Sequence, residues 1–548
     1  MKIMFCGAAT DVTGSCHLIS TDDHKILLDC GQFQGGAAAD ALNAKDFPFN
    51  PTEIEAVLLS HAHIDHCGRL PLLVKRGFKG IIYGTDATID LLDIMLKDSA
   101  HIQEQDTETQ NRKNKRAGRA LEEPLYTTAD VLKVMELTRP VHYDTLVEIN
   151  DQMKFVFNDA GHILGSAITE VWVEEGEKCR KIVFSGDLGM DDRPILKDPK
   201  RIKKADCLIM ESTYGDRLHE DNPISIDKLA DIVARTIARG GNVVIPSFAV
   251  GRTQELVFEL NKLIDGQGEY AEALKDVPVY VDSPMSVKST EVFRDNAQDY
   301  DEEMKLYILS GDHPLDFKNL HYSLTSKDSQ RINTDTTPKV IISSSGMCDA
   351  GRIRHHLKHN LWNPKCSVVF VGYQAEGTVG RRLLDGAKEI KLFGETISVA
   401  AEMYNLEGFS GHADRNGLFS WLSGFINKPD NIFLVHGEYE AKNAFAKYVK
   451  EHKNWDCTVV NGYDEYTLAD GISVSPTAEK DFADPKDIDD VRTRLYKLHD
   501  GLEKVMYNAA GTMQGELTES RMTDLKNTIA SLEKDMMKLG AVITREDR

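Results

Sequence analysis

The sequence pattern of this chain changes near residue 240 and changes back near residue 394. Residues 1 to about 212 contain short apolar segments, such as 56–59 and 154–157, and several such segments end at a Gly, Asp or His. The same pattern returns after about residue 394. Because 548 residues are too many for one hydrophobic core, we expect one domain that is interrupted by another.

The interrupting segment repeats a different unit. An apolar stretch, a Gly- and Ser-rich loop and a helical pattern follow one another in 241–264, 277–295, 338–361 and 367–386. This order is typical of a parallel α/β sheet. Each loop leads into a helix, where free backbone N–H groups and the helix dipole favour anions. The inserted domain is therefore predicted to be α/β, with anion-binding loops.

Three histidines and an aspartate, His61, His63, Asp65 and His66, occur within six residues after the apolar segment 56–59. Zinc prefers imidazole nitrogen and carboxylate oxygen as ligands. His61 and His63 are two residues apart and can face one metal ion, while Asp65 and His66 can face a second. Packing four polar side chains together requires something that neutralises and orients them. The cluster therefore predicts metal binding.

Other candidates lie at the ends of apolar segments. His162 and Asp187 precede the insertion, and His412 and His436 follow it. A single histidine at a strand end more often has a structural role, but the joint pattern makes these residues candidate ligands. Asp29 also ends an apolar segment and is a candidate to orient a ligand or its loop.

These residues resemble the metallo-β-lactamase fold family, whose hydrolases hold two metal ions, usually zinc, with HxHxDH and later strand-end residues. Glu211 in MESTYG, His412 in GFSGHAD and His436 in VHGE further resemble the three extra motifs of the β-CASP nucleic-acid nucleases. GRTQEL, DSPMS, SSSGMCDAGR and VGYQAEGTVGR extend the likeness over residues 1 to about 475. His436 is similar to the RNA-processing branch, which includes the endonuclease subunit of the cleavage and polyadenylation specificity factor and its stand-alone prokaryotic relatives. The DNA-repair branch typically has Val there.

The resemblance implies an α/β fold with a metallo-β-lactamase αββα sandwich in 1–212 and 395–475. A parallel-sheet β-CASP domain in 213–394 would interrupt it. The tail, 476–548, lies outside the likeness. Apolar residues spaced three and four apart in 486–508 and 520–540 predict a hairpin of two amphipathic helices. These helices can pack on each other, on the body or on a second subunit, so a homodimer is one alternative.

The resemblance also implies a ligand set and a mechanism. One zinc would be held by His61, His63, His162 and Asp187, and the other by Asp65, His66, His436 and the bridging Asp187. Manganese can use the same ligands if zinc is scarce. RNA would be hydrolysed to a 5′-phosphate and a 3′-hydroxyl, with His412 protonating the departing oxygen and Glu211 holding its other nitrogen. Asp65 would belong to both the catalytic and the ligand sets. Outside the resemblance, Glu211 could merely cap a turn and His412 could merely start a helix.

Single-stranded RNA would lie in a cleft between the two domains. The candidate contacts are a loop suited to phosphate and arginines early in the following helices. They are Ser343, Ser344, Ser345, Gly346, Arg252, Arg352, Arg381 and Arg382. The arginines can instead pair with the abundant carboxylates of this chain.

Four functions share these residues. The leading hypothesis is a zinc-dependent endoribonuclease. A 5′-to-3′ exoribonuclease resembling RNase J would need a pocket for the 5′-phosphate. An inactive RNA-binding scaffold would have lost metal ligands, whereas every expected ligand position holds a competent residue. A small-molecule metallohydrolase would not need the insertion.

Composition restricts the partners and the compartment. A formal charge of −22 argues against a protein that coats nucleic acid nonspecifically. A polar helix is predicted over 97–119, and its terminal basic run is either a solvated surface or an RNA-backbone contact. No apolar run approaches the roughly 18 residues that cross a bilayer, so no membrane partner is expected. Nine cysteines without a CxxC pair, and no recognisable signal peptide, favour a cytoplasmic protein.

Overall fold

The computed structural model describes residues 1–468 except 10, 11, 35, 36, 221, 267, 269, 312, 373, 375, 376 and 463, and five positions between 522 and 531. The predicted tail hairpin otherwise lies outside the described residues. Apart from residues 306–312, both domains considered below belong to one compact unit, Met1–Lys305 and His313–Glu479. No helix in the described part of the chain is long and apolar enough to span a membrane.

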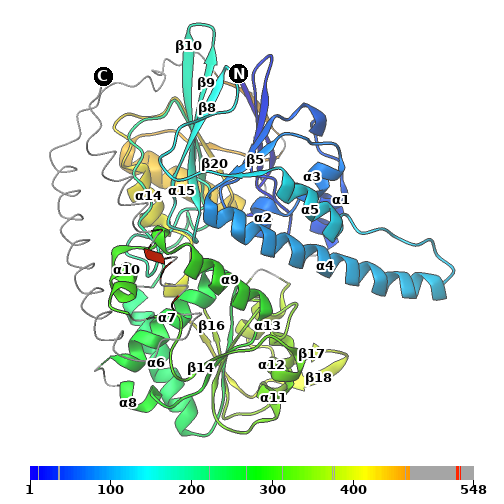
Figure 1. Ribbon diagram of the computed structural model, residues 1–548, viewed down its shortest axis with the longest axis vertical. Helices are drawn as coiled ribbons and strands as arrows, with labels where there is room; N and C mark the ends of the chain where they lie inside the picture. Colours follow the sequence, from blue (N-terminus) through cyan, green and yellow to red (C-terminus); the bar gives the residue numbers. More distant parts are fainter. Residues whose placement is uncertain are drawn as a thin grey trace. The chain divides into compact units, whose positions relative to one another are not determined.

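Two seven-stranded sheets form the first domain (Figure 1). The first sheet runs β22 (Glu465–Thr467), β1 (Lys2–Gly7), β2 (Cys16–Ser20), β3 (Lys25–Leu28), β4 (Ala56–Leu58), β5 (Ile81–Gly84) and β6 (Thr138–Pro140). The second runs β21 (Thr458–Val459), β20 (Asn431–Val435), β11 (Cys207–Glu211), β10 (Lys178–Phe184), β9 (Ala167–Glu175), β8 (Met153–Asp159) and β7 (Val147–Glu148).

The sheets pack face to face. Alternate residues Met153, Phe155 and Phe157 of β8 are buried in the same core as Phe5 and Ile19 of the first sheet. Helices cover the outer faces with separate apolar clusters. The first sheet carries α3 (Leu70–Lys75), α4 (Asp86–Arg116) and α5 (Thr128–Glu136), and the second carries α14 (Arg415–Leu422) and α15 (Tyr439–Lys453). The predicted αββα sandwich is confirmed.

The inserted domain contains a six-stranded sheet in which every pairing is parallel. Its order is β14 (Leu320–Tyr322), β13 (Val279–Val281), β15 (Val340–Ser343), β12 (Val243–Pro246), β16 (Ser367–Phe370) and β19 (Glu402–Asn405). The four predicted units supply β12, β13, β15 and β16, followed by α7 (Arg252–Asp265), α9 (Pro284–Asp295), α12 (Ile353–Asn360) and α13 (Val379–Leu384). The predicted parallel α/β domain is therefore confirmed.

Further elements complete the two domains. The helices are α1 (Ala37–Ala44), α2 (Ile64–Cys67), α6 (Asn222–Ala238), α8 (Ala271–Leu274), α10 (Glu302–Leu309) and α11 (Ser326–Thr334). The hairpin β17 (Glu389–Leu392) and β18 (Glu395–Ser398) forms a separate two-stranded sheet.

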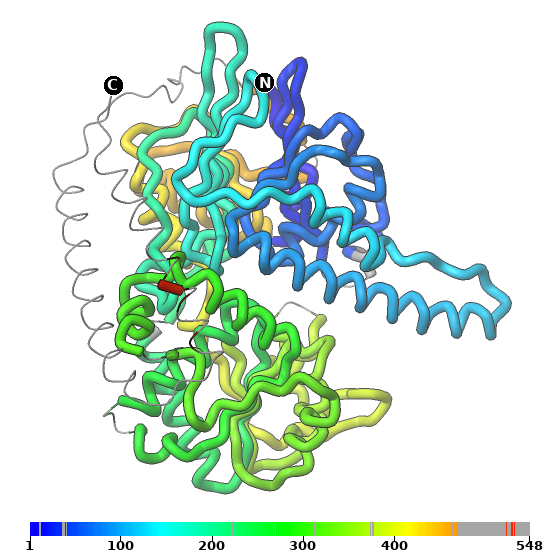
Figure 2. Tube along the Cα trace, in the orientation of Figure 1, coloured from blue at the N-terminus to red at the C-terminus, as the bar shows by residue number. Residues whose placement is uncertain are grey.

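The path of the chain positions the functional residues. The chain leaves the sandwich after β11, passes through the six-stranded sheet and returns through α14 to β20 (Figure 2). β20 pairs with β11 in parallel, and Val435 lies opposite Glu211. The insertion therefore brings Glu211 beside His436, although more than 200 residues separate them in the sequence.

Helix α4 begins earlier than predicted, at Asp86 rather than near residue 97, and ends at Arg116. Thr85 caps its first turn by accepting a hydrogen bond from the Thr88 N–H group. Ile89, Leu92 and Leu96 bury this first half against the outer face of the first sheet. The prediction covered only the polar second half of the helix. The buried apolar residues of the first half extend it back to Asp86.

We expect the pH dependence of stability to report on Glu259, a buried residue of α7. Burial raises the pKa of Glu259 from 4.5 to about 7, Lys262 opposes the shift, and Glu255 adds to it. The folded protein thus holds this proton more tightly than the unfolded chain, and the resulting stability is lost as pH rises from about 4.5 through 7. The free energy of unfolding of Glu259→Gln, measured relative to that of the wild type, should therefore be up to about 3 kcal/mol higher at pH 8 than at pH 4.

Thermal melts of both proteins across this pH range measure the effect. Glu291→Gln, at an exposed position of α9, is the matched control and should follow the wild type at every pH. Parallel curves for Glu259→Gln and the wild type would contradict the expectation.

Candidate metal centre

His61, His63, His162 and Asp187 form the first group of candidate ligands. His63 Nδ1 lies 3.1 Å from His61 Nε2 and 3.2 Å from His162 Nε2. Asp187 Oδ2 lies 3.5 Å from His61 Nε2 and 3.6 Å from His162 Nε2. Loops after β4, β8 and β10 carry these side chains to one edge of the sandwich.

Asp65, His66 and His436 form the second group. His66 Nε2 lies 3.1 Å from His436 Nε2, and Asp65 Oδ2 lies 3.5 Å from the same His436 nitrogen. Asp65 and His66 sit in the short helix α2, one turn after His63. The other oxygen of Asp187, Oδ1, lies 3.3 Å from His66 Nε2 and 3.6 Å from His436 Nε2. Asp187 thus turns one oxygen toward each group.

The two groups fit metal ions. Asp187 Oδ1 is buried and accepts no hydrogen bond from any residue that the structure describes. Imidazole nitrogens that face one another at 3.1–3.2 Å can share only one proton per pair, whereas a cation between them would satisfy every lone pair. Imidazole nitrogen and carboxylate oxygen are the donor types that zinc binds, and manganese accepts them too.

The protonation of the three histidines in the first group also suits ligation. Burial lowers the pKa of His63 to about 4 and lowers that of His61 and His162 well below the usual range. These side chains are therefore neutral, the form in which imidazole binds a metal. Burial opposes charge on His66 as well, but Asp187 and Asp29 outweigh it and raise the pKa of His66.

A layer of hydrogen bonds orients the ligands. Asp29 Oδ2 accepts a hydrogen bond from His66 Nδ1 at 2.7 Å, which leaves Nε2 to face the second group. The Ser15 and Ser60 hydroxyls donate to the same oxygen of Asp29. His162 Nδ1 donates to the Gly411 carbonyl at 3.1 Å. Asp29 thus contacts a candidate ligand, and its orienting role stays a prediction.

Replacing Asp29 with asparagine is expected to weaken metal binding by about 10- to 100-fold, since a partner that fixes a ligand's orientation has effects of this size. Competition against a chromophoric chelator measures the affinity. Asp282→Asn is the matched control, because Asp282 is also buried and also holds a histidine, His356, at 2.7 Å, but in the inserted domain. Equal affinities for Asp29→Asn and the control would refute this role.

His412 and Glu211 lie beside the first group. His412 Nδ1 is 3.3 Å from Glu211 Oε1 and 3.9 Å from Asp187 Oδ2. Burial lowers the pKa of His412, but attraction to Glu211 and Asp187 outweighs it and raises this pKa to about 9. Backbone and side-chain groups of Leu188 and Thr213 donate to Glu211 and fix its carboxylate. The buried Glu211 thus holds a protonated His412 at the edge of the candidate metal centre.

Thr213 was not predicted from the sequence. Its hydroxyl lies 2.6 Å from Glu211 Oε2 and 3.1 Å from His436 Nδ1, so one side chain connects the His412 partner to the second ligand group. It occurs in MESTYG, directly after Glu211 and Ser212, but its role depends on β20 lying beside β11.

Sequence comparison matches residues 9–247 to the metallo-beta-lactamase superfamily, 253–383 to the Beta-Casp domain and 396–460 to the Zn-dependent metallo-hydrolase RNA specificity domain. Ribonuclease TTHA0252 of Thermus thermophilus is 36% identical over 447 residues, which cover 82% of this chain and 95% of that protein. The chain belongs to the β-CASP family of the metallo-β-lactamase superfamily.

Two further relatives of this β-CASP protein carry the name transcription termination factor FttA. The factor of Methanocaldococcus jannaschii is 32% identical over 460 residues, covering 82% of this chain and 69% of the relative. That of Methanococcus maripaludis is 31% identical over 468 residues, covering 83% and 70%.

Three of the four arginines predicted to contact substrate are engaged with carboxylates. Arg252 is buried and pairs with Glu255, Arg352 bonds Asp282 at 2.6 Å, and Arg381 bonds Asp385 at 2.9 Å. This matches the alternative in which they pair with acidic residues. Arg382 is exposed.

The predicted phosphate loop follows β15 at the carboxyl edge of the β-CASP sheet. Ser343 and Ser344 direct their hydroxyls to the Asp282 carbonyl and the Ser283 hydroxyl, each at 2.8 Å. Ser345 and Gly346 continue the same loop. The first two hydroxyls therefore already have partners within the domain.

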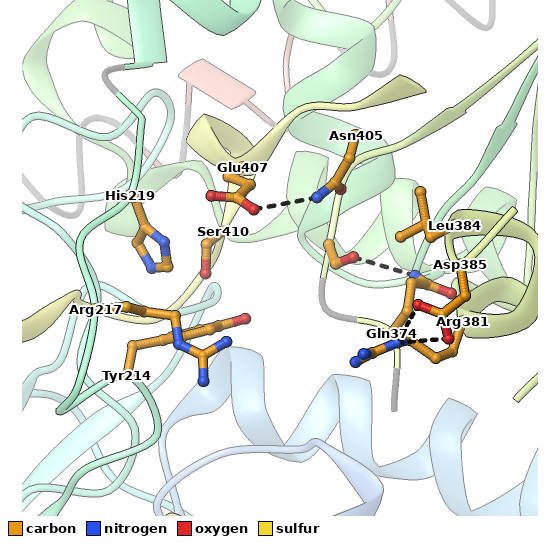
Figure 3. Close-up of a pocket in the computed structure, with 11 residues that line it drawn as sticks. Tyr214, Arg217, His219, Gln374, Arg381, Leu384, Asp385, Asn405, Glu407 and Ser410 are labelled. Atoms are coloured by element: carbon orange, nitrogen blue, oxygen red, sulfur yellow. Dashed lines mark hydrogen bonds and ion pairs between the residues drawn. The ribbon is translucent and has the colours of Figure 1, made fainter. Parts of the chain in front are cut away.

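A pocket of about 250 Å³ is lined by Ser410, two residues before His412 in the chain, and by residues of both domains (Figure 3). Tyr214, Arg217 and His219 line it from the segment after β11, and Gln374, Arg381 and Asn405 line it from the β-CASP domain. The Tyr214 ring lies 6.0 Å from the His412 ring. Arg217 and Arg381 lie on opposite sides of the pocket in Figure 3. Sequence analysis singled out only Arg381 among these residues, because the pocket exists only once the two domains meet.

Proposed function

We propose that this β-CASP protein is a ribonuclease that uses two metal ions to hydrolyse internal phosphodiester bonds of single-stranded RNA, leaving 5′-phosphate and 3′-hydroxyl ends. The proposal rests chiefly on Asp187, whose two oxygens face two separate groups of nitrogen and oxygen ligands. The relative named ribonuclease TTHA0252, similar over 95% of its length, supports RNA as the substrate.

The first ion would be held by His61, His63, His162 and Asp187, and the second by Asp65, His66, His436 and Asp187. When bound, such ions lower the pKa of water to near 7 and neutralise charge on a phosphodiester. We assign zinc to both positions, with manganese as an alternative for the same donors. Asp29 orients His66, and the Gly411 carbonyl orients His162.

His412 would donate a proton to the departing 3′-oxygen. Its Nδ1 faces Glu211, so Nε2 is the nitrogen left to face the substrate. Its side chain is 21% exposed, whereas Glu211 is fully enclosed. Glu211 would keep the imidazole protonated and in one orientation, as a general acid requires.

The pocket lined by Ser410 supports a second candidate, a 5′-to-3′ exoribonuclease. The pocket holds two arginines and lies on the side of the centre where the leaving nucleotide would sit. A 5′-phosphate bound there would restrict cleavage to the terminal nucleotide. The complete ligand set disfavours an inactive scaffold, and the β-CASP domain disfavours a small-molecule hydrolase.

A short 5′-labelled RNA incubated with the purified protein separates these functions. We expect labelled fragments of several lengths, which disappear when a chelator is added and return with zinc. Immediate release of labelled mononucleotide would instead establish the exoribonuclease. RNA that stays intact with the metal-loaded protein would refute both.

A further inference from the structure

We propose that Phe248 of the β-CASP domain is a stacking platform for an RNA base and thereby positions the strand at the metal centre. The inference rests on the proposed ribonuclease function and extends it to a substrate contact. Phe248 follows β12 and precedes α7. Its side chain is 40% exposed, although it lies between buried residues.

The loop around Phe248 is held in place. Ser247 and Ala249 are buried on either side of it. The Thr253 hydroxyl donates to the Phe248 carbonyl at 2.7 Å, and the Ser247 N–H group donates to the Ser343 carbonyl at 3.0 Å. Exposing a large apolar ring is unfavourable. Aromatic side chains dominate the energetics of contact surfaces, so a ring that stays exposed on a loop anchored by hydrogen bonds is a candidate contact.

Two glycines support the ring. A Cβ atom on Gly346 would lie 3.1 Å from two ring carbons of Phe248, and one on Gly372 would lie 3.6 Å from the ring. Gly346 follows β15 and Gly372 follows β16, the two neighbours of β12 in the sheet. The backbone at these two glycines thus approaches the ring closely, and a side chain at Gly346 would crowd it.

The same loop reaches the metal centre. A Cβ atom on Gly251 would lie 3.0 Å from the side chain of Ile163, the residue after His162. A Cβ atom on Gly411, the residue before His412, would lie 3.4 Å from Arg252 Nη2. Gly251 comes three positions after Phe248, and an extended chain over three such steps spans at most about 11 Å. Phe248 is therefore within reach of nucleotides next to the bond that is cut.

The chemistry of the site suits an unpaired base. Aromatic side chains stack on the faces of all four bases, so a bare phenyl ring gives affinity with little sequence preference. It also lies at the carboxyl edge of a parallel sheet, where ligands of such sheets bind. Three other aromatic side chains among the described residues are similarly exposed, namely Trp362, Phe393 and Tyr439.

Phe393 provides a matched control. It is 45% exposed, but it lies at the β17–β18 hairpin and stacks on His355, with ring centres 4.3 Å apart. Phe248→Leu removes the aromatic face and keeps an apolar side chain, whereas Phe248→Trp keeps the face. Phe393→Leu makes the same change away from the proposed contact. Melting temperatures of all three establish that the variants are folded.

The test combines kinetics with a binding signal. We expect Phe248→Leu to raise the KM for single-stranded RNA about tenfold, the size usual for one stacked base. Phe248→Trp should restore it, and Phe393→Leu should match wild type. Turnover of a small aryl phosphodiester, which has no base, should be unchanged in every variant. RNA carrying 2-aminopurine should show fluorescence quenching with wild type and Phe248→Trp but not with Phe248→Leu.

Unchanged KM and unchanged quenching in Phe248→Leu would overturn the proposal, as would an equal loss in Phe393→Leu. A loss that extends to the aryl ester would assign Phe248 to the metal centre instead. If wild type cleaves no RNA, the proposed function fails, but the 2-aminopurine titration still decides whether Phe248 stacks on a base.

Discussion

Replacing Asp187 with asparagine is expected to remove bound metal and abolish RNA cleavage. The carboxylate places one oxygen within 3.6 Å of the imidazoles of each ligand group. An asparagine amide supplies one neutral oxygen and one NH2 donor, so at least one of the two ligand groups loses the negatively charged oxygen that Asp187 gave it. The loss of metal affinity should exceed the roughly 100-fold that substitution of an orienting partner causes. Elemental analysis of the purified variant gives the metal content per chain.

Asp282→Asn again serves as control, because it also neutralises a fully buried aspartate paired with a histidine. It should keep the metal content of wild type. The bridging role of Asp187 would be wrong if Asp187→Asn retained two ions per chain, or if Asp282→Asn lost them as well.

Replacing His412 with asparagine is expected to lower kcat on RNA by about 10²- to 10⁴-fold, the usual contribution of a general acid. Metal content should stay the same, because His412 belongs neither to the ligand group that contains His162 nor to the one that contains His66. KM should change little. Steady-state kinetics and elemental analysis on the same preparation separate these effects.

A second substrate makes this test specific. An aryl phosphodiester releases a phenolate that leaves without being protonated, so its hydrolysis should lose far less in His412→Asn than RNA cleavage does. An equal loss on both substrates, or a loss of metal, would show that His412 is not the acid.

The local part of the metal centre could be predicted from the sequence. His61, His63, Asp65 and His66 are close in the chain, so spacing alone indicated that they converge, and in the structure the His61 ring centre lies 4.8 Å from that of His63 and 4.0 Å from that of His66. His162, Asp187 and His436 lie far apart in the chain; their positions at strand ends made them candidates, and the likeness to a family assigned them to the same centre. The pairing of β8, β9, β10, β11 and β20 in one sheet brings the loops that carry them to the same edge of the sandwich.

Features that depend on two distant segments could not be predicted. Thr213 gains its role from His436, and Tyr214 and Arg217 line a pocket only because β-CASP residues face them. Single residues at helix starts were also uncertain, since an arginine there can bind an anion or a neighbouring carboxylate. The structure shows Arg252 and Arg352 in ion pairs because acidic partners lie in reach.

The most direct test of the whole account is a zinc titration of the metal-stripped protein, followed by cleavage of 5′-labelled RNA at each step. Because the two ligand groups share Asp187, we expect no cleavage without metal and full activity once two ions are bound per chain. Cleavage by the metal-free protein, or intact RNA at full zinc occupancy, would contradict a ribonuclease built on this centre.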